Sequence, residues 1–263
     1  MTVNTMALEG ALRLLRQAVD EGDVPAIATA VWHGSDLLAE QAFGTPGWVV
    51  GEAPLEVTAP FLVASITKPV VCVGAMLLVQ RGLLSLDEPV ASHIPAFGTH
   101  GKAGITLRHL MTHTSGLPDQ LPQNVALRRE HAGLERFVGA VCDLAPLFTP
   151  GTRVSYQSKG LLMLGAVIER ITHQPLRDYL RQALFMPLGM DRTTLGMPAG
   201  GFKASVRAND SPTERQSAVD SDYGWNSVYW RDLGAPWGGL HATAGDLSRL
   251  LRHMLGILPG PLS

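Results

Sequence analysis

The stretch FLVASITK at residues 61–68 determines how the rest of the chain is interpreted. Ser65 and Lys68 are three positions apart, so on a helix they share one face and lie one turn from each other. A serine hydroxyl becomes a good nucleophile when a neighbouring base takes its proton, and a neutral lysine can do this. Apolar neighbours favour neutral lysine because burial penalises its charge. The stretch therefore predicts an activated serine.

The position of Ser65 at the start of a helix adds a second chemical feature. The first N–H groups of a helix have no partner within the helix, so the N–H of Ser65 is free to face a developing oxyanion. A Ser-x-x-Lys tetrapeptide alone is a weak signal, and its meaning depends on the motifs that accompany it.

Four further motifs follow in a fixed order. They are GITLRHLMTHTSGLP at 104–118, PGTRVSYQS at 150–158, PLGM at 187–190 and GGLHATAGDL at 238–247. In their order along the chain and in their amino-acid sequences, the five motifs resemble those of the class C β-lactamase-like family of serine hydrolases. That family comprises class C β-lactamases, family VIII carboxylesterases, D-stereospecific peptidases and related acyltransferases. The resemblance runs from the first strands to about residue 255.

The resemblance implies catalytic roles for three residues. Ser65 would be the acylated nucleophile and Lys68 its hydrogen-bonded partner. Tyr156 would be the phenol or phenolate that moves a proton between nucleophile, leaving group and water. A lysine close to this tyrosine would stabilise the phenolate. The implied reaction is acyl transfer in two steps, in which Ser65 takes the acyl group and water removes it.

Three more residues are candidates for substrate binding. Ser158 stands where the β-lactamases of the family usually carry asparagine, and its short hydroxyl cannot present both a donor and an acceptor to an amide. This departure favours esters over β-lactams. Trp237 and Gly238 are expected near the site, and Trp237 belongs to an aromatic cluster that either lines an acyl pocket or pins a loop onto the body. The cluster comprises Tyr223, Trp225, Tyr229, Trp230 and Trp237.

The family's last motif, Lys or His followed by Thr or Ser and Gly, has no counterpart after the 238–255 region. In the family this motif lies on a strand that supplies the second oxyanion N–H. We therefore expect an α+β, β-lactamase/transpeptidase-like fold with an antiparallel sheet flanked by helices and a helical subdomain, lacking the usual C-terminal strands. A homodimer or a second chain would then complete the sheet.

The pattern along the chain predicts three parts. Residues 1–64 form a helix and a β-hairpin of the α/β part, 65–195 form a helical part, and 196–263 form an aromatic loop and a helix that return to the α/β part. The expected elements are a helix at 7–21, strands at 26–32 and 37–43, and helices at 65–80, from Asp87-Glu88-Pro89 onward, at 135–141 and at 160–172. A capping box at 243–246 opens the last helix, which runs to about 255.

Composition excludes several classes of function. Apolar residues make up 46% of the 263 residues, and 21 basic against 23 acidic residues give a net charge of −2. This balance argues against nucleic-acid or membrane-surface binding. The longest apolar run, 69–79, is too short to span a bilayer, and no signal peptide precedes it. We therefore expect a cytoplasmic protein.

Other site chemistries fit the sequence poorly. His109 and His113 have the spacing of a helical zinc pair, but a third ligand is missing, so we expect no metal. A triad of His113, Ser115 and Asp119 lacks a nucleophile elbow, and phosphate-cradling glycine motifs are absent, so we expect no cofactor.

The sequence is thus interpreted as a serine carboxylesterase that cleaves esters of short or medium acyl chain through a Ser65 acyl-enzyme. The alternatives are a β-lactamase or D-amino-acid peptidase of the same fold, or a truncated, non-catalytic acyl-binding protein. In every version the expected ligand is a small ester or amide.

Overall fold

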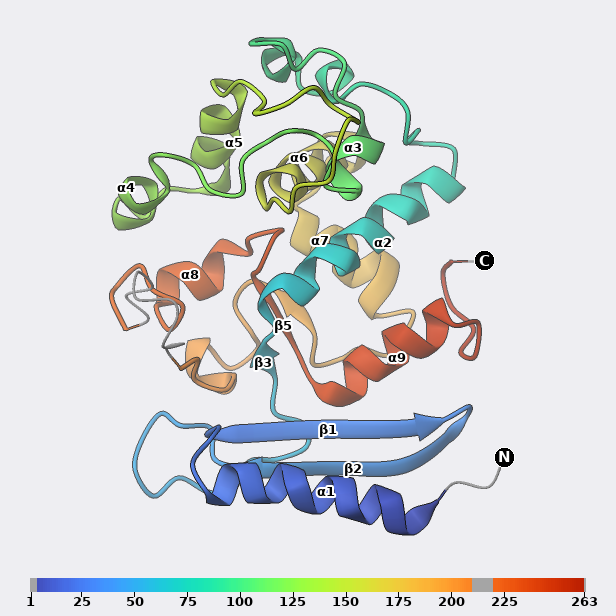
Figure 1. Ribbon diagram of the computed structural model, residues 1–263, viewed down its shortest axis with the longest axis vertical. Coiled ribbons are helices and arrows are strands. Elements are labelled where there is room, and N and C mark those ends of the chain that lie inside the picture. The colour runs from blue at the N-terminus through green and yellow to red at the C-terminus, as the bar shows by residue number, and fades with distance from the viewer. Residues whose placement is uncertain (1–3, 210–219, 263) are drawn as a thin grey trace.

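A computed structural model describes residues 4–209 and 220–262, and Figure 1 shows its elements in three layers. One end of the molecule is a β-hairpin with α1, the middle holds a second small sheet with α2, α7, α8 and α9, and the other end is helical. The elements are α1 (Thr5–Asp20), β1 (Ala26–His33), β2 (Asp36–Gly44), β3 (Phe61–Leu62), η1 (Ala64–Ile66), α2 (Thr67–Gln80), η2 (Val90–Ser92), η3 (Pro95–Gly98), α3 (Leu107–Met111), α4 (Asn124–Arg129), α5 (Leu134–Cys142), α6 (Lys159–Thr172), α7 (Leu176–Leu180), η4 (Arg181–Phe185), β4 (Thr194–Leu195), η5 (Phe202–Ala204), α8 (Val228–Leu233), β5 (Leu240–Ala242) and α9 (Ala244–Met254).

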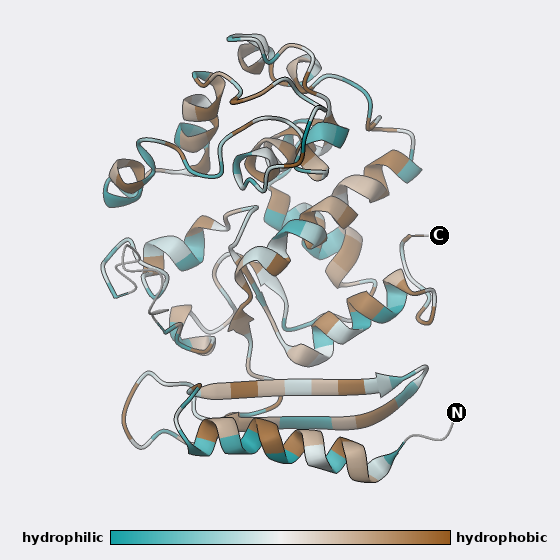
Figure 2. Cartoon of the chain, in the orientation of Figure 1, coloured by the Kyte–Doolittle hydropathy of each residue, from teal (hydrophilic) through white to brown (hydrophobic). Residues whose placement is uncertain are grey.

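The hairpin predicted near the N-terminus is confirmed. Strands β1 and β2 pair antiparallel from Ala26 opposite Gly44 to His33 opposite Asp36. Gly34, with φ of 59°, takes the left-handed conformation that a two-residue turn requires. Helix α1 packs against β2 and helix α9 against β1. Figure 2 shows hydrophilic and hydrophobic residues on both helices, as expected for helices that cover a sheet.

Helix α2 is the central helix of the fold. It is mostly hydrophobic (Figure 2), and most of its residues are buried between α6 and α7. Gly74 permits the close approach of α7, since a Cβ atom there would lie 2.5 Å from Cδ2 of Leu180. Tyr179 donates a hydrogen bond of 2.9 Å to the carbonyl of Gly74. This packing fixes the helix whose first turn carries Ser65 and Lys68.

A second, three-stranded sheet of order β3–β5–β4 joins distant parts of the chain. Phe61 pairs with Ala242, and Thr194 pairs with His241, both antiparallel. This sheet holds the segment before Ser65 beside the segment that follows Trp237. Within residues 4–209 and 220–262, no helix is both long and apolar enough to cross a membrane.

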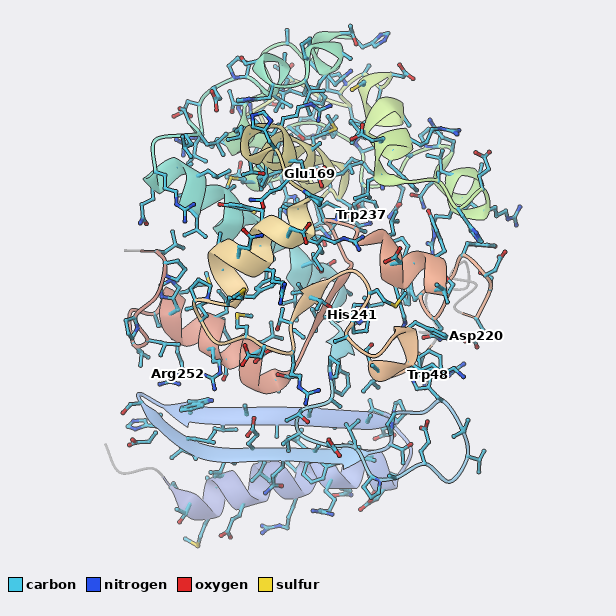
Figure 3. The ribbon with its side chains drawn as sticks, turned by 180° about the vertical axis from the view of Figure 1, so that it is seen from behind. Trp48, Glu169, Asp220, Trp237, His241 and Arg252 are labelled. Carbon is cyan, nitrogen blue, oxygen red and sulfur yellow. The ribbon has the colours of Figure 1, made fainter. Side chains whose placement is uncertain are left out.

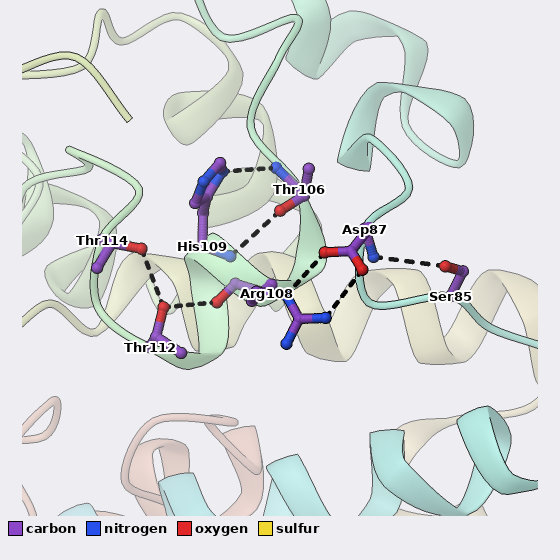
Figure 4. A network of polar contacts seen from close by, with 7 residues as sticks. All are labelled: Ser85, Asp87, Thr106, Arg108, His109, Thr112 and Thr114. Atoms are coloured by element: carbon purple, nitrogen blue, oxygen red, sulfur yellow. Dashed lines mark hydrogen bonds and ion pairs between the residues drawn. The ribbon is translucent and has the colours of Figure 1, made fainter. Parts of the chain in front are cut away.

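The prediction that a helix begins at Asp87-Glu88-Pro89 is wrong. Only the short 3-10 turn η2 forms, because Val90 N donates to Ile105 O and Pro89 bridges to Thr106. The backbone of this segment is therefore paired with a distant strand-like segment. The carboxylate of Asp87 does not cap a helix and instead accepts from Arg108 Nε at 2.7 Å (Figure 4).

The capping box at 243–246 is half formed. Thr243 accepts a hydrogen bond from Asp246 N at 3.0 Å, as an N-cap residue does. The carboxylate of Asp246 accepts instead from Arg192 N at 3.0 Å and from the hydroxyl of Thr193 at 2.8 Å. Asp246 therefore anchors α9 to the segment before β4. The helices predicted at 65–80, 135–141, 160–172 and 243–255 are confirmed within one or two residues.

A buried lysine that the sequence analysis did not single out stabilises the helical half. Lys102 is fully buried, and its Nζ donates to the carbonyls of Thr99 at 3.0 Å, Cys142 at 2.9 Å and Leu144. Cys142 is the last residue of α5 and Leu144 lies two residues beyond it, at a helix end where a cation also complements the helix dipole.

We expect Lys102→Met to lower the free energy of unfolding by about 2–4 kcal/mol, because three carbonyls lose their hydrogen bond to the ammonium group. Urea unfolding followed by circular dichroism measures this. Lys203→Met, at an exposed lysine, is the control and should change stability by less than about 0.5 kcal/mol. An equal effect of both substitutions would contradict the assigned role of Lys102.

Candidate functional site

Ser65, Lys68 and Tyr156 meet at the start of α2. Lys68 Nζ donates to Ser65 Oγ at 2.9 Å, which is the contact predicted from their spacing on one helical face. The hydroxyl of Tyr156, from the loop before α6, donates to Ser65 Oγ at 2.8 Å. The ammonium of Lys68 lies 4.8 Å from the centre of the Tyr156 ring. The three reactive groups therefore form one hydrogen-bonded cluster.

The members of this cluster differ in exposure. Ser65 is exposed and Tyr156 is 53% exposed, whereas Lys68 is 5% exposed. A second hydrogen bond of 2.9 Å, to the carbonyl of Trp237, holds Lys68 Nζ in place. A substrate can thus reach the serine while the lysine is shielded from bulk water.

The backbone around Ser65 is held in an uncommon conformation. Ala64 has φ of 45°, a left-handed value that a residue with a Cβ adopts rarely. The buried Thr67 fixes this turn, since its hydroxyl donates to Ala64 O at 2.6 Å and accepts from Leu240 N at 3.0 Å. No carbonyl within the described residues accepts from Ser65 N. That N–H is available to an oxyanion, as expected at a helix start.

Trp237 and Gly238 lie against this turn. A Cβ atom on Gly238 would lie 3.9 Å from the carbonyl carbon of Ala64, so a side chain there would extend along the turn before Ser65. Figure 3 shows Trp237 at the centre of the molecule, where the residue is 8% exposed. The structure thus brings Trp237 and Gly238 together with the Ser65 cluster.

Ser158 is placed differently from the other candidates. It precedes α6, is 5% exposed, and its hydroxyl donates to Asp119 Oδ1 at 2.7 Å. The hydroxyl is therefore committed to a carboxylate of the protein. Asp119 was considered in the sequence only as a member of a triad that the structure does not form.

Lys159 is a second buried lysine near the site. Its Nζ lies 3.5 Å from Asn124 Oδ1 and 4.5 Å from the ring centre of Trp237. Burial, with a smaller effect of the charges of Lys68 and Arg128, lowers the pKa of Lys159 to about 8, and the carboxylate of Asp119 opposes this shift. No local sequence pattern identifies this residue, because its neighbours come from four separate segments.

Lys159→Met should raise the free energy of unfolding at pH 7 by about 1–3 kcal/mol. The pKa of Lys159 is 10.5 in its ordinary environment and about 8 in the fold, so below pH 8 the folded chain carries the full penalty of a buried charge. Between about pH 8 and 10.5 the unfolded chain binds more protons, and wild-type stability rises with pH by linkage. Urea unfolding at pH 7 and 9.5 should show a smaller rise for the variant. A variant with the wild-type rise would contradict this.

The two histidines of the 104–118 motif have separate partners. His109 Nδ1 accepts from Thr106 N at 3.1 Å and completes a capping box on α3 (Figure 4). His113 instead lies beside Tyr156, with ring centres 4.8 Å apart. In the described parts of the chain, no group of three or more His, Cys, Asp or Glu side chains is arranged to hold a metal ion.

The aromatic residues of the loop before α8 and within α8 are fixed to the body of the protein. Tyr229 donates to Ala132 O at 2.9 Å and stacks on His131 with ring centres 4.7 Å apart. Trp230 contacts Trp237 edge to face at 6.1 Å. Residues 210–219 of the expected loop lie outside the described residues. The cluster reaches the Ser65 site through Trp237.

Fold and site together define an α+β protein in which a lysine and a tyrosine contact an exposed serine. The chain belongs to the beta-lactamase family, whose model matches residues 12–262. The resemblance and the β-lactamase/transpeptidase-like fold predicted from the sequence are confirmed. Family members that the chain matches include esterases, class C β-lactamases, penicillin-binding proteins and D-amino acid amidases.

Three relatives show the range of the similarity. Esterase EstB of Burkholderia gladioli is 36% identical over 182 residues, which cover 64% of this chain and 46% of EstB. Penicillin-binding protein 4* of Bacillus subtilis (strain 168) is 30% identical over 165 residues, which cover 61% and 36%. The structure of a class C beta lactamase from Rhodobacter sphaeroides matches with a TM-score of 0.74 and 26% identity, covering 95% of this chain and 66% of that chain. The match thus spans less than half the length of either curated relative.

Proposed function

We propose that this chain is a serine carboxylesterase that cleaves esters of short or medium acyl chain through an acyl-enzyme on Ser65. One observation carries the proposal. An exposed serine hydroxyl receives hydrogen bonds from a buried lysine at 2.9 Å and from a tyrosine at 2.8 Å. A serine that only begins a helix does not require a lysine and a tyrosine that both donate to its exposed hydroxyl.

In the proposed reaction, Lys68 and Tyr156 share one proton fewer than they can hold, so one of them accepts the Ser65 proton. Ser65 Oγ then attacks the ester carbonyl, and the oxyanion faces Ser65 N. The bond to the alcohol oxygen breaks as the Lys68–Tyr156 pair returns the proton to that oxygen. Water then attacks the acyl carbon and gives its proton to the pair. The bond from that carbon to Ser65 Oγ breaks, the pair returns the proton to Oγ, and the acid is released.

Two features favour esters over amides. The hydroxyl of Ser158 donates to Asp119 and is not offered to a substrate amide. The amine released from an amide is also a poorer leaving group than the alcohol released from an alkyl ester. Cleavage of an amide therefore requires the substrate to be held in a more closely defined orientation. The similarity to an esterase, EstB, supports the same assignment.

Turnover of three substrates tests the proposal: p-nitrophenyl butyrate, nitrocefin and a D-phenylalanine p-nitroanilide. Each rate is corrected with Ser65→Ala. We expect kcat/KM for the butyrate ester to exceed the other two at least about 100-fold. Preference for nitrocefin or the anilide would show a β-lactamase or a D-amino-acid peptidase. A Ser65 adduct that never turns over would show an acyl-binding protein.

We propose in addition that two copies of the chain associate as a homodimer. Size-exclusion chromatography with light scattering measures the oligomeric state directly.

A further inference from the structure

His113 contacts the ring of Tyr156 and forms hydrogen bonds with the two residues that flank it. The two rings are 4.8 Å apart and inclined at 41°. Ser155 N donates to His113 O at 2.8 Å, and Gln157 N donates to His113 Nδ1 at 3.4 Å. One residue thus binds the chain on both sides of the tyrosine and packs against the tyrosine itself.

The backbone conformation of His113 is unusual for a residue with a side chain. It has φ of 58°, a left-handed value that costs free energy for a residue with a Cβ. This backbone directs its carbonyl and its ring toward the same three-residue segment. Glycine would adopt the conformation more easily but would supply neither the ring nor the acceptor.

The hydrogen bond from Gln157 fixes the protonation state of the ring. Nδ1 can accept only when it carries no proton, so the neutral ring carries its proton on Nε2. Burial and the charge of Lys68 lower the pKa of His113, while the charge of Asp119 acts in the opposite direction. The ring is therefore neutral at pH 7, and its protonation would remove the acceptor and place a second cation near Lys68.

We propose that neutral His113 is the positioning residue that holds Tyr156 against Ser65, and that protonation of its ring releases Tyr156. The inference rests on the proposed function. His113 is assigned no contact with a reacting atom, and its proposed role is to hold the tyrosine in place.

Two substitutions separate the ring from the acceptor. His113→Asn keeps an acceptor near the position of Nδ1 and tolerates the left-handed backbone, but it has no ring and does not titrate. His113→Phe keeps a ring but has no acceptor. We expect kcat for ester turnover to fall about 10- to 100-fold in each variant, with KM changed less than about 3-fold, because a displaced tyrosine impairs the chemical step.

The acid side of the pH profile distinguishes positioning from a general structural effect. As pH falls, kcat/KM of the wild type should fall more steeply than that of His113→Asn, because two groups take up protons in the wild type and one fewer does in the variant. His131→Asn is the matched control, since His131 also has a positive φ and stacks on a tyrosine, Tyr229, away from Ser65. It should keep the wild-type kcat and profile.

Wild-type kcat in His113→Asn, or equal acid limbs in wild type and His113→Asn, would overturn the proposal. If His113→Phe fails to fold, His113→Asn carries the test. Nitrogen-15 NMR of the histidine rings supplies a readout independent of turnover. The proposal requires the Nε2–H tautomer of His113, and an Nδ1–H tautomer would refute it. If the wild type shows no ester turnover but His113 carries the Nε2–H tautomer, the esterase assignment is contradicted. The placement of His113 beside Tyr156 is then still supported.

Discussion

Ser65→Ala should reduce turnover of p-nitrophenyl butyrate by about 10⁴- to 10⁶-fold, the loss expected when a covalent nucleophile is removed. Lys68 Nζ and the Tyr156 hydroxyl would both keep their positions but lose their shared acceptor. Because Ser65 is exposed, its hydroxyl fills no core space, and the melting temperature should stay within a few degrees of the wild type.

Steady-state kinetics with a thermal melt on the same preparation measures both effects. Ser35→Ala, in the exposed hairpin turn, is the control and should leave turnover unchanged. A Ser65→Ala enzyme that retains more than a tenth of wild-type activity would mean that the acyl group is transferred by another route.

Lys68→Met should lower kcat/KM for ester turnover by about 10²- to 10⁴-fold, the contribution typical of a general base. Methionine resembles lysine in length and fits the buried site, but it cannot accept the Ser65 proton. The Trp237 carbonyl would lose its donor, at a cost of about 1–3 kcal/mol, while removal of a buried charge acts in the opposite direction.

Lys68→Arg distinguishes a base from a fixed positive charge. Arginine keeps the charge but does not lose its proton in proteins. If lysine serves as a base, both variants should be impaired to a similar extent in the single-turnover reaction with a fluorophosphonate, in which Ser65 Oγ displaces fluoride from phosphorus. Recovery of this phosphonylation rate in Lys68→Arg would show that only the positive charge is needed.

The parts of the fold that could be predicted from sequence depend on local chain geometry. The hairpin follows from two short apolar runs around Gly34, and α2 follows from an apolar segment that ends at a glycine. The contact between Ser65 and Lys68 follows from helical spacing alone. The helix expected after Asp87 failed because Val90 pairs with Ile105, a contact that no local pattern encodes.

The site likewise contains contacts that follow from local spacing and contacts that depend on the tertiary fold. Tyr156 lies far from Ser65 in the chain, and only the resemblance to a known family connected them. Asp119 and Lys159 acquire their significance from partners on separate segments, so spacing gave no signal for them. His113 belongs to the 104–118 motif, yet its contact with Tyr156 depends on how two loops meet.

The intact mass of the purified chain before and after a fluorophosphonate probe, with peptide mapping of the adduct, tests the central claim most directly. We expect one adduct per chain, located on Ser65, formed alongside steady turnover of p-nitrophenyl butyrate. Ester turnover without an adduct, or an adduct on any other residue, would contradict the assignment of Ser65 as the acylated nucleophile.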